Sequence, residues 1–347
     1  MNNFLTLILT TSLYLCLDIQ NSISVGYEDN FLRFSDLEMN SNLFENGTSN
    51  DYMGDSRFFD SSIISPSTQL TYHSKINDYK TKTIIRFKFN EYQSSNQKSY
   101  FNLNARYEIK LKSYNWIKFS YSLTPRYYLR TFIDRDLVPL VYYPCYFSNE
   151  NFYLSYSHPI ANFKKTWMDI KFNINNQFYN ENFTEFDTRV YTFEGSIKSS
   201  FIKSYFLSMS YFLALAENIS YGNQNQFYES TKIDRSYTKH GFKMHAKKTL
   251  KNSFINSLSL KLKYSIRDYD LDSWYYEYDN WKKYYETEFI LELTKKLNKK
   301  TSIKISGKHF YRDVVSSQSK ETLWIEDYKI YNRNELWFKF IYNFRYK

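Results

Sequence analysis

The stretch NSLSLKLKYSI, residues 256–266, places apolar and polar side chains at strictly alternating positions. Side chains of a β-strand point alternately to the two faces of a sheet, whereas steps of two residues along an α-helix turn by about 200° and would scatter the apolar side chains. The pattern therefore predicts a strand with one polar face and one apolar face, the apolar residues being Leu258, Leu260, Leu262, Tyr264 and Ile266. A soluble β-sandwich and a membrane barrel both contain strands of this kind.

The same alternation recurs along the chain in six further segments, at residues 101–111, 117–123, 168–174, 205–215, 289–293 and 336–346. About ten residues is the length that a tilted strand needs to cross the hydrocarbon of a bilayer. Aromatic residues make up 21% of the chain, and they suit both strands and membrane interfaces. These features favour strands that span a membrane.

The spacing of the strands separates the barrel from the sandwich. We predict strands near residues 22–28, 67–76, 80–90, 99–111, 116–128, 151–158, 166–178, 187–198, 204–215, 235–247, 256–267, 284–295, 301–311 and 333–346. The gaps between them are alternately long and short, which is typical of outer-membrane barrels and has no cause in a soluble sandwich. The predicted fold class is all-β, a transmembrane antiparallel β-barrel of about 14 strands. Because residues 22–66 show no clear alternation, 12 or 16 strands are the alternatives.

The N-terminal segment FLTLILTTSLYLCL, residues 4–17, is a continuous apolar run followed by polar residues. It predicts a secretory signal peptide at residues 1–24, with Ser22 and Ser24 forming a small-x-small cleavage site. The barrel domain is then predicted at residues 25–347, with residues 29–66 as a long first loop or a partial plug. Without the signal peptide Cys145 is the only cysteine, which excludes an internal disulfide and a thiolate metal site. No cofactor or metal is predicted.

Residues 22–347 resemble bacterial outer-membrane β-barrel proteins. The resemblance rests on the exported start, on SVGYEDN leading into a long first loop, and on the last strand ELWFKFIYNFRYK with Tyr346 next to its end. It implies the cell outer membrane of a Gram-negative-type bacterium as the location, and the lipid bilayer and the barrel-assembly machinery, which reads the C-terminal strand, as partners. No narrower family motif is recognisable, so the resemblance implies no substrate.

The chain carries a formal net charge of +10. Its basic residues stand singly at alternate strand positions instead of in runs, which excludes a nucleic-acid partner. A lysine that faces lipid near the bilayer midplane costs about 2–4 kcal/mol, so these residues are predicted to point into the lumen. The predicted lumen-lining residues are Arg86, Lys88, Arg106, Lys118, Lys239, Lys243, Lys261, Lys263, Lys304, Lys308 and Lys339, with the acids Glu286, Glu288 and Glu292 among them.

Two functions fit such a lumen. An excess of basic residues favours entry of small anionic solutes, so the chain is predicted to be a porin-like channel. Alternatively, the charges pair across strands and fill the lumen, and the chain is a non-conducting surface barrel that acts as an adhesin or as a structural or assembly protein.

Two smaller features complete the sequence prediction. The segment TFIDRDLVPLVYYPCYFSNEN, residues 131–151, is predicted to be an apolar outer loop that either constricts the mouth or packs on its rim, the constricting residues being Tyr142, Tyr143, Pro144 and Tyr146. A barrel hydrolase with His309 as its base is a distant third function. No Ser or carboxylate pairs with His309 at a recognisable spacing, so the chain is predicted not to be an enzyme.

Overall fold

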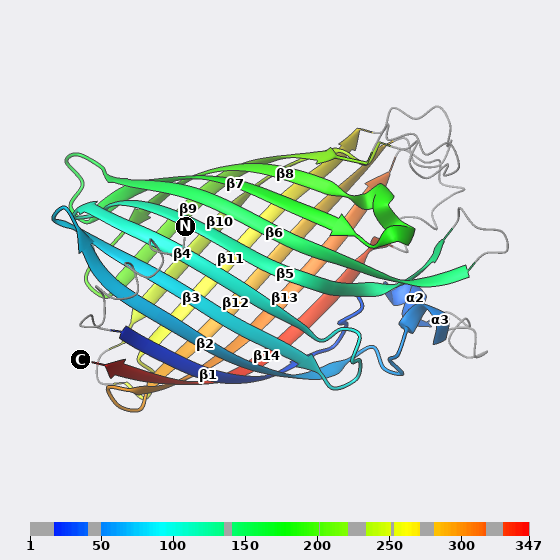
Figure 1. Cartoon of the computed structure of the whole chain (residues 1–347), viewed down its shortest axis with the longest axis horizontal. Helices are drawn as coiled ribbons and strands as arrows, with labels where there is room; N and C mark the ends of the chain where they lie inside the picture. The colour runs from blue at the N-terminus through cyan, green and yellow to red at the C-terminus, as the bar shows by residue number, and fades with distance from the viewer. Residues whose placement is uncertain are drawn as a thin grey trace, which may run out of the picture.

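The computed structural model describes residues 17–40, 50–134, 141–200, 202–220, 234–250, 253–270, 281–316 and 329–346. These residues form a closed barrel of fourteen antiparallel strands, in which every strand pairs with its neighbours along the chain and β1 pairs with β14 (Figure 1). The predicted fourteen-strand barrel is therefore confirmed. The strands are β1 (Leu17–Glu28), β2 (Ser61–Ile76), β3 (Tyr79–Tyr92), β4 (Tyr100–Lys112), β5 (Asn115–Asp134), β6 (Val141–Pro159), β7 (Thr166–Tyr179), β8 (Thr188–Ser199), β9 (Tyr205–Asn218), β10 (Tyr237–Thr249), β11 (Ser257–Asp270), β12 (Trp281–Lys296), β13 (Thr301–Ser316) and β14 (Tyr331–Tyr346).

The connections at the two ends of the barrel differ in length, as predicted. Short turns at residues 77–78, 113–114, 160–165, 200–204, 250–256 and 297–300 lie at the end where β1 begins and β14 ends, which we call the turn end. The opposite end, the loop end, carries the longer connections and the short helices α2 (Asp36–Asn40), α3 (Asn50–Met53) and η1 (Glu181–Phe186). Among the described residues no helix has both the length and the apolar character needed to cross a membrane.

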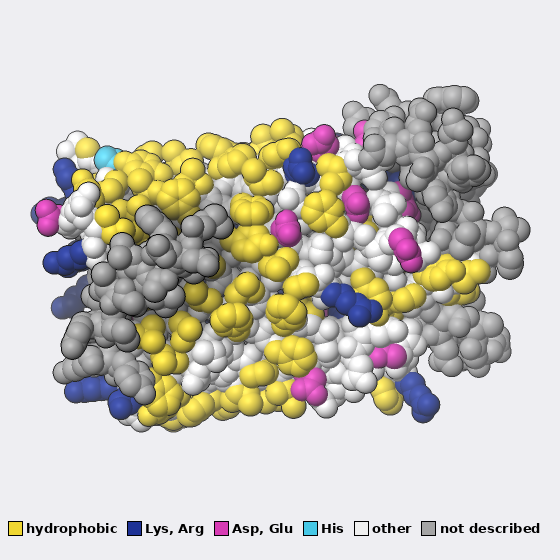
Figure 2. All heavy atoms as spheres, viewed as in Figure 1, with side chains coloured by type: hydrophobic (Ala, Val, Ile, Leu, Met, Phe, Trp, Pro, Cys, Tyr) yellow, Lys and Arg dark blue, Asp and Glu magenta, His cyan; other side chains and the backbone are white. Residues whose placement is uncertain are grey.

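The outer surface of the barrel is apolar. In β11 the side chains of Leu258, Leu260 and Leu262 are exposed, whereas Ser259 and Ser265 between and beyond them are buried. The alternation read from the sequence thus places the leucines outside and the polar residues inside. Figure 2 shows the same apolar covering over the barrel wall. An apolar surface of this extent is explained by contact with lipid.

The first strand begins earlier than predicted. β1 starts at Leu17 and pairs residue by residue with both β14 and β2, Leu17 lying opposite Tyr346 and Tyr72. Cleavage after Ser24 would leave only Val25–Glu28 of this strand to close the barrel. The signal peptide at residues 1–24 stays a prediction. The predicted first loop also ends earlier, because β2 begins at Ser61.

The prediction of an outer loop at residues 131–151 is wrong. β5 continues to Asp134 and β6 begins at Val141, so most of the segment forms a two-stranded extension of the barrel wall beyond the loop end (Figure 1). Tyr142, Tyr143, Pro144 and Tyr146 are residues of β6, paired with residues of β5 from Tyr128 to Ile133. Their apolar character, which suggested a constriction, instead reflects strand pairing and packing within this extension.

Candidate functional site

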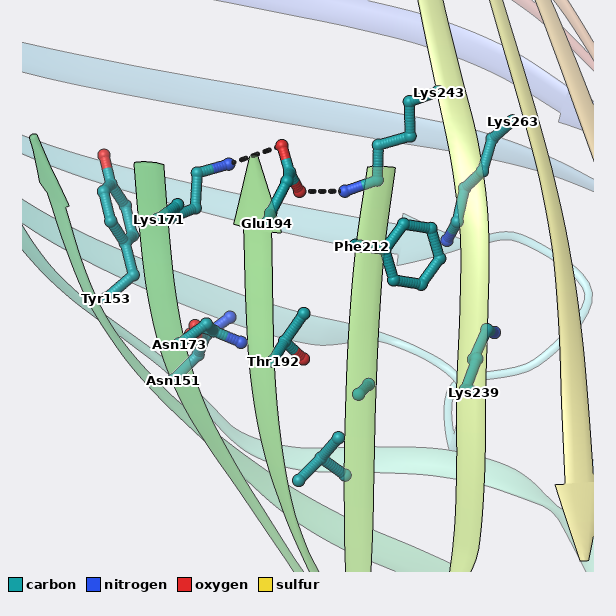
Figure 3. Close-up of a pocket in the computed structure, with 12 residues that line it drawn as sticks. Asn151, Tyr153, Lys171, Asn173, Thr192, Glu194, Phe212, Lys239, Lys243 and Lys263 are labelled. Carbon is teal, nitrogen blue, oxygen red and sulfur yellow. Dashed lines mark hydrogen bonds and ion pairs between the residues drawn. The ribbon is translucent and has the colours of Figure 1, made fainter. Parts of the chain in front are cut away.

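The lumen contains a cavity of about 340 Å³ against the wall formed by β6–β11, which we call the hollow wall. Strand alternation brings inward-facing residues of six neighbouring strands, most of them polar, to this cavity, and Figure 3 shows their side chains around it. The residues that line it are Asn151, Tyr153, Lys171, Asn173, Val190, Thr192, Glu194, Phe212, Ala214, Lys239, Lys243 and Lys263. Three of the predicted lumen lysines, Lys239, Lys243 and Lys263, therefore share one cavity.

Glu194 is the only carboxylate in the lining of this cavity, and two lysines hold it. Lys171 Nζ lies 3.3 Å from Glu194 Oε1, and Lys243 Nζ pairs with Oε2 of the same carboxylate (Figure 3). Lys263 stands apart from this group, with its Nζ 5.7 Å from the centre of the Phe212 ring. The fourth lysine of the lining, Lys239, pairs with Glu286 outside the cavity, so three lysines remain with one acid.

Glu286 forms a second charged cluster, closer to the loop end. Its carboxylate is buried and pairs with Arg312 at 2.6 Å, with Arg267 at 3.4 Å and with Lys239. Three basic groups around one buried acid fix the side chains of β10, β11, β12 and β13 relative to one another. This cluster supports the structural interpretation of the lumen charges for these residues.

The other predicted acids of β12 pair toward β13. Glu288 lies 3.2 Å from Lys308, and Glu292 lies 2.9 Å from Lys304. Lys308 also reaches Glu335 of β14 at 3.2 Å. Because β12 directs both acids to β13, it leaves the lysines of β11 without a carboxylate partner. Within the described part of the chain no Asp or Glu forms an ion pair with the predicted lumen residues Arg86, Lys88, Lys118, Lys261, Lys263 or Lys339.

The opposite side of the lumen is covered at the loop end by the first loop. We call the described residues of this loop, 29–40 and 50–60, the plug, and we call the strands β3–β5 and β14 the plugged wall. Phe31, Leu32, Phe34 and Met53 of the plug are almost fully buried in one apolar cluster. The cluster includes inward-facing aromatic residues of the barrel, namely Tyr92, Tyr100, Tyr128, Tyr146 and Trp337.

Trp337 packs flat against β1 because residue 26 is a glycine. A Cβ atom at Gly26 would lie 2.4 Å from the nearest atom of the Trp337 ring, which is closer than side chains tolerate. The Nζ of Lys88 lies 5.6 Å from the centre of the same ring. Lys88 and Lys339, both predicted to line an anion pathway, thus belong to the wall that carries the plug.

Polar contacts fasten the plug to the barrel. Ser35 and Glu38 form a capping box at the start of α2, since Ser35 N donates to Glu38 Oε2 at 2.8 Å and Glu38 N donates to Ser35 Oγ at 3.1 Å. The same Glu38 carboxylate receives both terminal nitrogens of Arg130, at 2.9 and 3.1 Å. The sequence analysis did not predict this two-point ion pair between α2 and β5. The motif SDLE at residues 35–38 is the sequence signal for the capping box at the start of α2.

Lys98, in the connection between β3 and β4, lies beside the plug and is almost fully buried. Its Nζ donates to the carbonyl oxygens of Tyr128 at 2.7 Å and Leu129 at 3.2 Å and lies 4.5 Å from the centre of the Tyr127 ring. Burial lowers the pKa of Lys98 below its ordinary value. Arg33 of the plug donates to the Tyr127 hydroxyl at 3.2 Å, so both basic groups meet at one tyrosine.

Other predicted site residues lie away from the cavity. Arg106 pairs with Glu108 on its own strand at 3.3 Å. His309 Nδ1 lies 2.8 Å from the amide oxygen of Asn334 on the neighbouring strand, and both side chains are exposed. Among the described residues no group of three or more His, Cys, Asp or Glu side chains could hold a metal ion.

Solved structures similar to this barrel include several outer-membrane proteins. Outer-membrane expressed OmpT of Vibrio cholerae is 8% identical, with 94% of this chain and 97% of that chain covered and a TM-score of 0.44. The outer membrane channel DcaP of Acinetobacter baumannii is 10% identical, with 95% and 97% covered and a TM-score of 0.44. An anion-selective porin from Comamonas acidovorans is 8% identical, with 94% and 98% covered and a TM-score of 0.41. No family model and no curated protein matches the sequence.

The closed ring, the apolar exterior, the polar interior and the alternation of short turns with long loops together define the class of this protein. It is a closed fourteen-strand antiparallel β-barrel with the architecture of outer-membrane β-barrels. In this class the turn end faces the periplasm and the loop end faces the outside of the cell.

Proposed function

We propose that this protein is an outer-membrane channel that conducts small anions along the hollow wall. The observation that carries the proposal is the charge balance of the 340 Å³ cavity. Lys171, Lys243 and Lys263 line it with the single carboxylate of Glu194, while Lys239 of the same lining pairs with Glu286. The low-dielectric wall of a barrel focuses the field of its fixed charges into the lumen, so an excess of positive charge lowers the barrier for anions and raises it for cations.

A second cavity extends the basic track toward the loop end. It measures about 210 Å³ and its lining contains Arg235, Arg267, Lys282 and Lys329, together with the tyrosines of β7, β10, β11 and β12, and no acid. Arg267 lies directly opposite Lys239 in the register of β10 and β11, so the two cavities are neighbours along the same wall. An anion moving between the loop end and the middle of the barrel would pass Arg235, Lys282 and Lys329 before it reaches Lys239 and Arg267, which both pair with Glu286.

Single-channel recording in planar bilayers tests the proposal. With a chloride salt at different concentrations on the two sides, the reversal potential of the wild-type channel is expected to have the sign of anion preference. Lys263→Glu is expected to shift it toward cations, and Glu194→Gln is expected to shift it the other way or leave it unchanged. A wild-type protein without conductance, or with cation preference, would overturn the proposal.

One observation favours the second candidate function, a non-conducting surface barrel. The plug buries an apolar cluster on the lumen side of the loop end, and such a cluster closes part of the mouth. Swelling of liposomes in small sugars and small anionic solutes separates the two candidates. If neither the wild type nor a variant without the plug permits swelling, the barrel is non-conducting and its loops carry the function. The proposal gives His309 no catalytic role; its ring contacts the amide of Asn334.

A further inference from the structure

Four neighbouring turns at the turn end each present an exposed apolar side chain among their described residues. They are the turns at residues 160–165, 200–204, 250–256 and 297–300, which follow one another around the barrel between β6 and β13. Their apolar residues Phe163, Ile202, Phe254 and Leu297 are exposed by 65%, 48%, 82% and 52%. Exposure of this degree at four successive tips is costly in water but favourable at a membrane interface, where aromatic and aliphatic side chains enter the headgroup region.

The same turns are basic. Lysines stand next to the exposed apolar residues at positions 164, 165, 203, 299 and 300, and the four turns contain no Asp or Glu. Two more lysines lie over exposed aromatic rings at this end, Lys295 with its Nζ 4.9 Å from the centre of the Phe254 ring and Lys248 at 5.2 Å from that of Tyr205. Each apolar tip therefore has a positive charge beside it.

Main-chain hydrogen bonds hold the described residues of these turns, which we call the rim, to a neighbouring turn or strand. Ser200 N donates to Lys165 O at 3.0 Å, and Thr249 N donates to Ser204 O at 2.7 Å. Asn256 N donates to Thr294 O at 2.9 Å, and Asn343 N of the last strand donates to Lys300 O at 2.9 Å. The lysines are thus held on a fixed frame, which reduces the entropy lost when a ligand binds to several of them.

The charge of this rim contrasts with that of the loop end. The loop at residues 180–187 contains two glutamates and Asp187 and no basic residue, and the first loop contains more acidic than basic residues. Figure 2 shows basic side chains gathered at the turn end and acidic side chains toward the opposite end. The charge asymmetry therefore runs along the barrel axis and is not a general consequence of the basic composition.

We propose that the rim of the four turns is a binding surface for anionic phospholipid headgroups of the periplasmic leaflet, of the phosphatidylglycerol or cardiolipin type. The lysines contact the headgroup phosphates, while Phe163, Ile202, Phe254 and Leu297 enter the interface beside them. Charge complementarity selects an anionic lipid over a zwitterionic one, and the apolar tips select a lipid surface over a soluble acidic protein.

Spin-labelled lipids test this assignment directly. The full chain is reconstituted in phosphatidylcholine bilayers, and the fraction of motionally restricted lipid is measured for spin-labelled phosphatidylglycerol and phosphatidylcholine. The wild type is expected to favour phosphatidylglycerol by about fivefold or more, which is the attraction that a single lysine near a membrane surface supplies. The preference is expected to fall at high salt.

Two sets of variants distinguish lipid binding at this rim from a general effect of the protein's positive charge. Replacement of Lys164, Lys165, Lys299 and Lys300 by glutamine is expected to abolish most of the preference, whereas their replacement by arginine is expected to keep it. Phe254→Ser is expected to weaken retention of both lipids without changing their ratio. Equal retention of the two lipids by the wild type, or an unchanged ratio in the glutamine variant, would overturn the proposal. So would a rim that binds a soluble acidic polypeptide as tightly as it retains phosphatidylglycerol.

Discussion

The plugged wall and the hollow wall line the same lumen and arise from the same alternating pattern, yet they differ in what occupies the space in front of them. Phe31, Leu32 and Phe34 of the plug pack in one cluster with aromatic residues of β3–β6 and β14, whereas a cavity of about 340 Å³ faces β6–β11. The difference shows that alternation decides which residues point inward but not which of them reach solvent in the lumen. A basic residue contributes to an ion pathway only where no segment of the chain covers it.

Removal of the plug is expected to have the largest effect. Glu28 and Ser61 lie opposite each other in the register of β1 and β2, so a short glycine-containing turn can replace residues 29–60 without disturbing the barrel. Single-channel conductance is expected to rise several-fold because the space in front of the plugged wall becomes open to solvent. Replacement of residues 180–187, the loop between β7 and β8, by a similar turn is the matched control and is expected to leave the conductance close to that of the wild type. An unchanged conductance without the plug would show that the plug does not limit the pathway.

The same charge change on the two walls is expected to have different effects. Lys263→Glu introduces an acid into the cavity, while Lys88→Glu introduces one beside Trp337 on the plugged wall. The reversal potential in a salt gradient is expected to shift toward cations much more for Lys263→Glu. Once residues 29–60 are removed, the two substitutions are expected to have similar effects. Equal shifts in the intact protein would mean that both walls line the pathway.

The ion pair of Glu38 with Arg130 joins the plug to β5 through two charge-assisted hydrogen bonds in a mostly buried position. It is expected to contribute about 2 kcal/mol to the free energy of unfolding. Glu38→Gln and Arg130→Gln are each expected to lower the free energy of unfolding in detergent by about this amount and to increase current fluctuations. Lys283→Gln is a control, because it removes an ion pair with Asp268 that is half exposed and is expected to cost less than about 1 kcal/mol. A double exchange of Glu38 and Arg130 that restores quiet currents would show that the pair itself holds the plug.

The sequence predicts the barrel well because lipid imposes a period of two on every strand. Leu258 and its neighbours could be assigned to the outer face, and the alternation of long and short gaps located the two ends of the barrel. The sequence predicts poorly where the connection between β1 and β2 and the connection between β5 and β6 begin and end. The segment from residue 131 to 151 looks like an apolar loop, and only its pairing across β5 and β6 reveals a strand extension.

The partners of the charged residues could not be predicted, for a different physical reason. Glu288 and Glu292 are residues of β12, and both neighbouring strands, β11 and β13, carry lysines within reach. The alternating pattern does not indicate which of the two strands supplies the partner. Glu292 and Glu288 pair with Lys304 and Lys308, so Lys261 and Lys263 have no carboxylate partner among the described residues. Which pairs form depends on how far each side chain reaches across its strand pair. A partial plug at residues 29–66 was one of the two sequence-based alternatives, but its anchor was not predicted, because Arg130 is distant from Glu38 in the chain and no sequence spacing reveals the pair.

The smallest expected effect concerns Lys98, a buried lysine beside the plug in the connection between β3 and β4. Because burial lowers its pKa in the folded protein, the unfolded chain binds more protons than the folded chain between that lowered pKa and the ordinary value near 10.5. The contribution of Lys98 to stability therefore rises as the pH rises through this interval. Lys98→Met, which removes the titrating group but keeps a long side chain, is expected to show a smaller gain in unfolding free energy between pH 8 and pH 10.5 than the wild type. Urea unfolding of both proteins in the same detergent at the two pH values provides the measurement, and an equal gain in both proteins would mean that Lys98 keeps its ordinary pKa beside the plug.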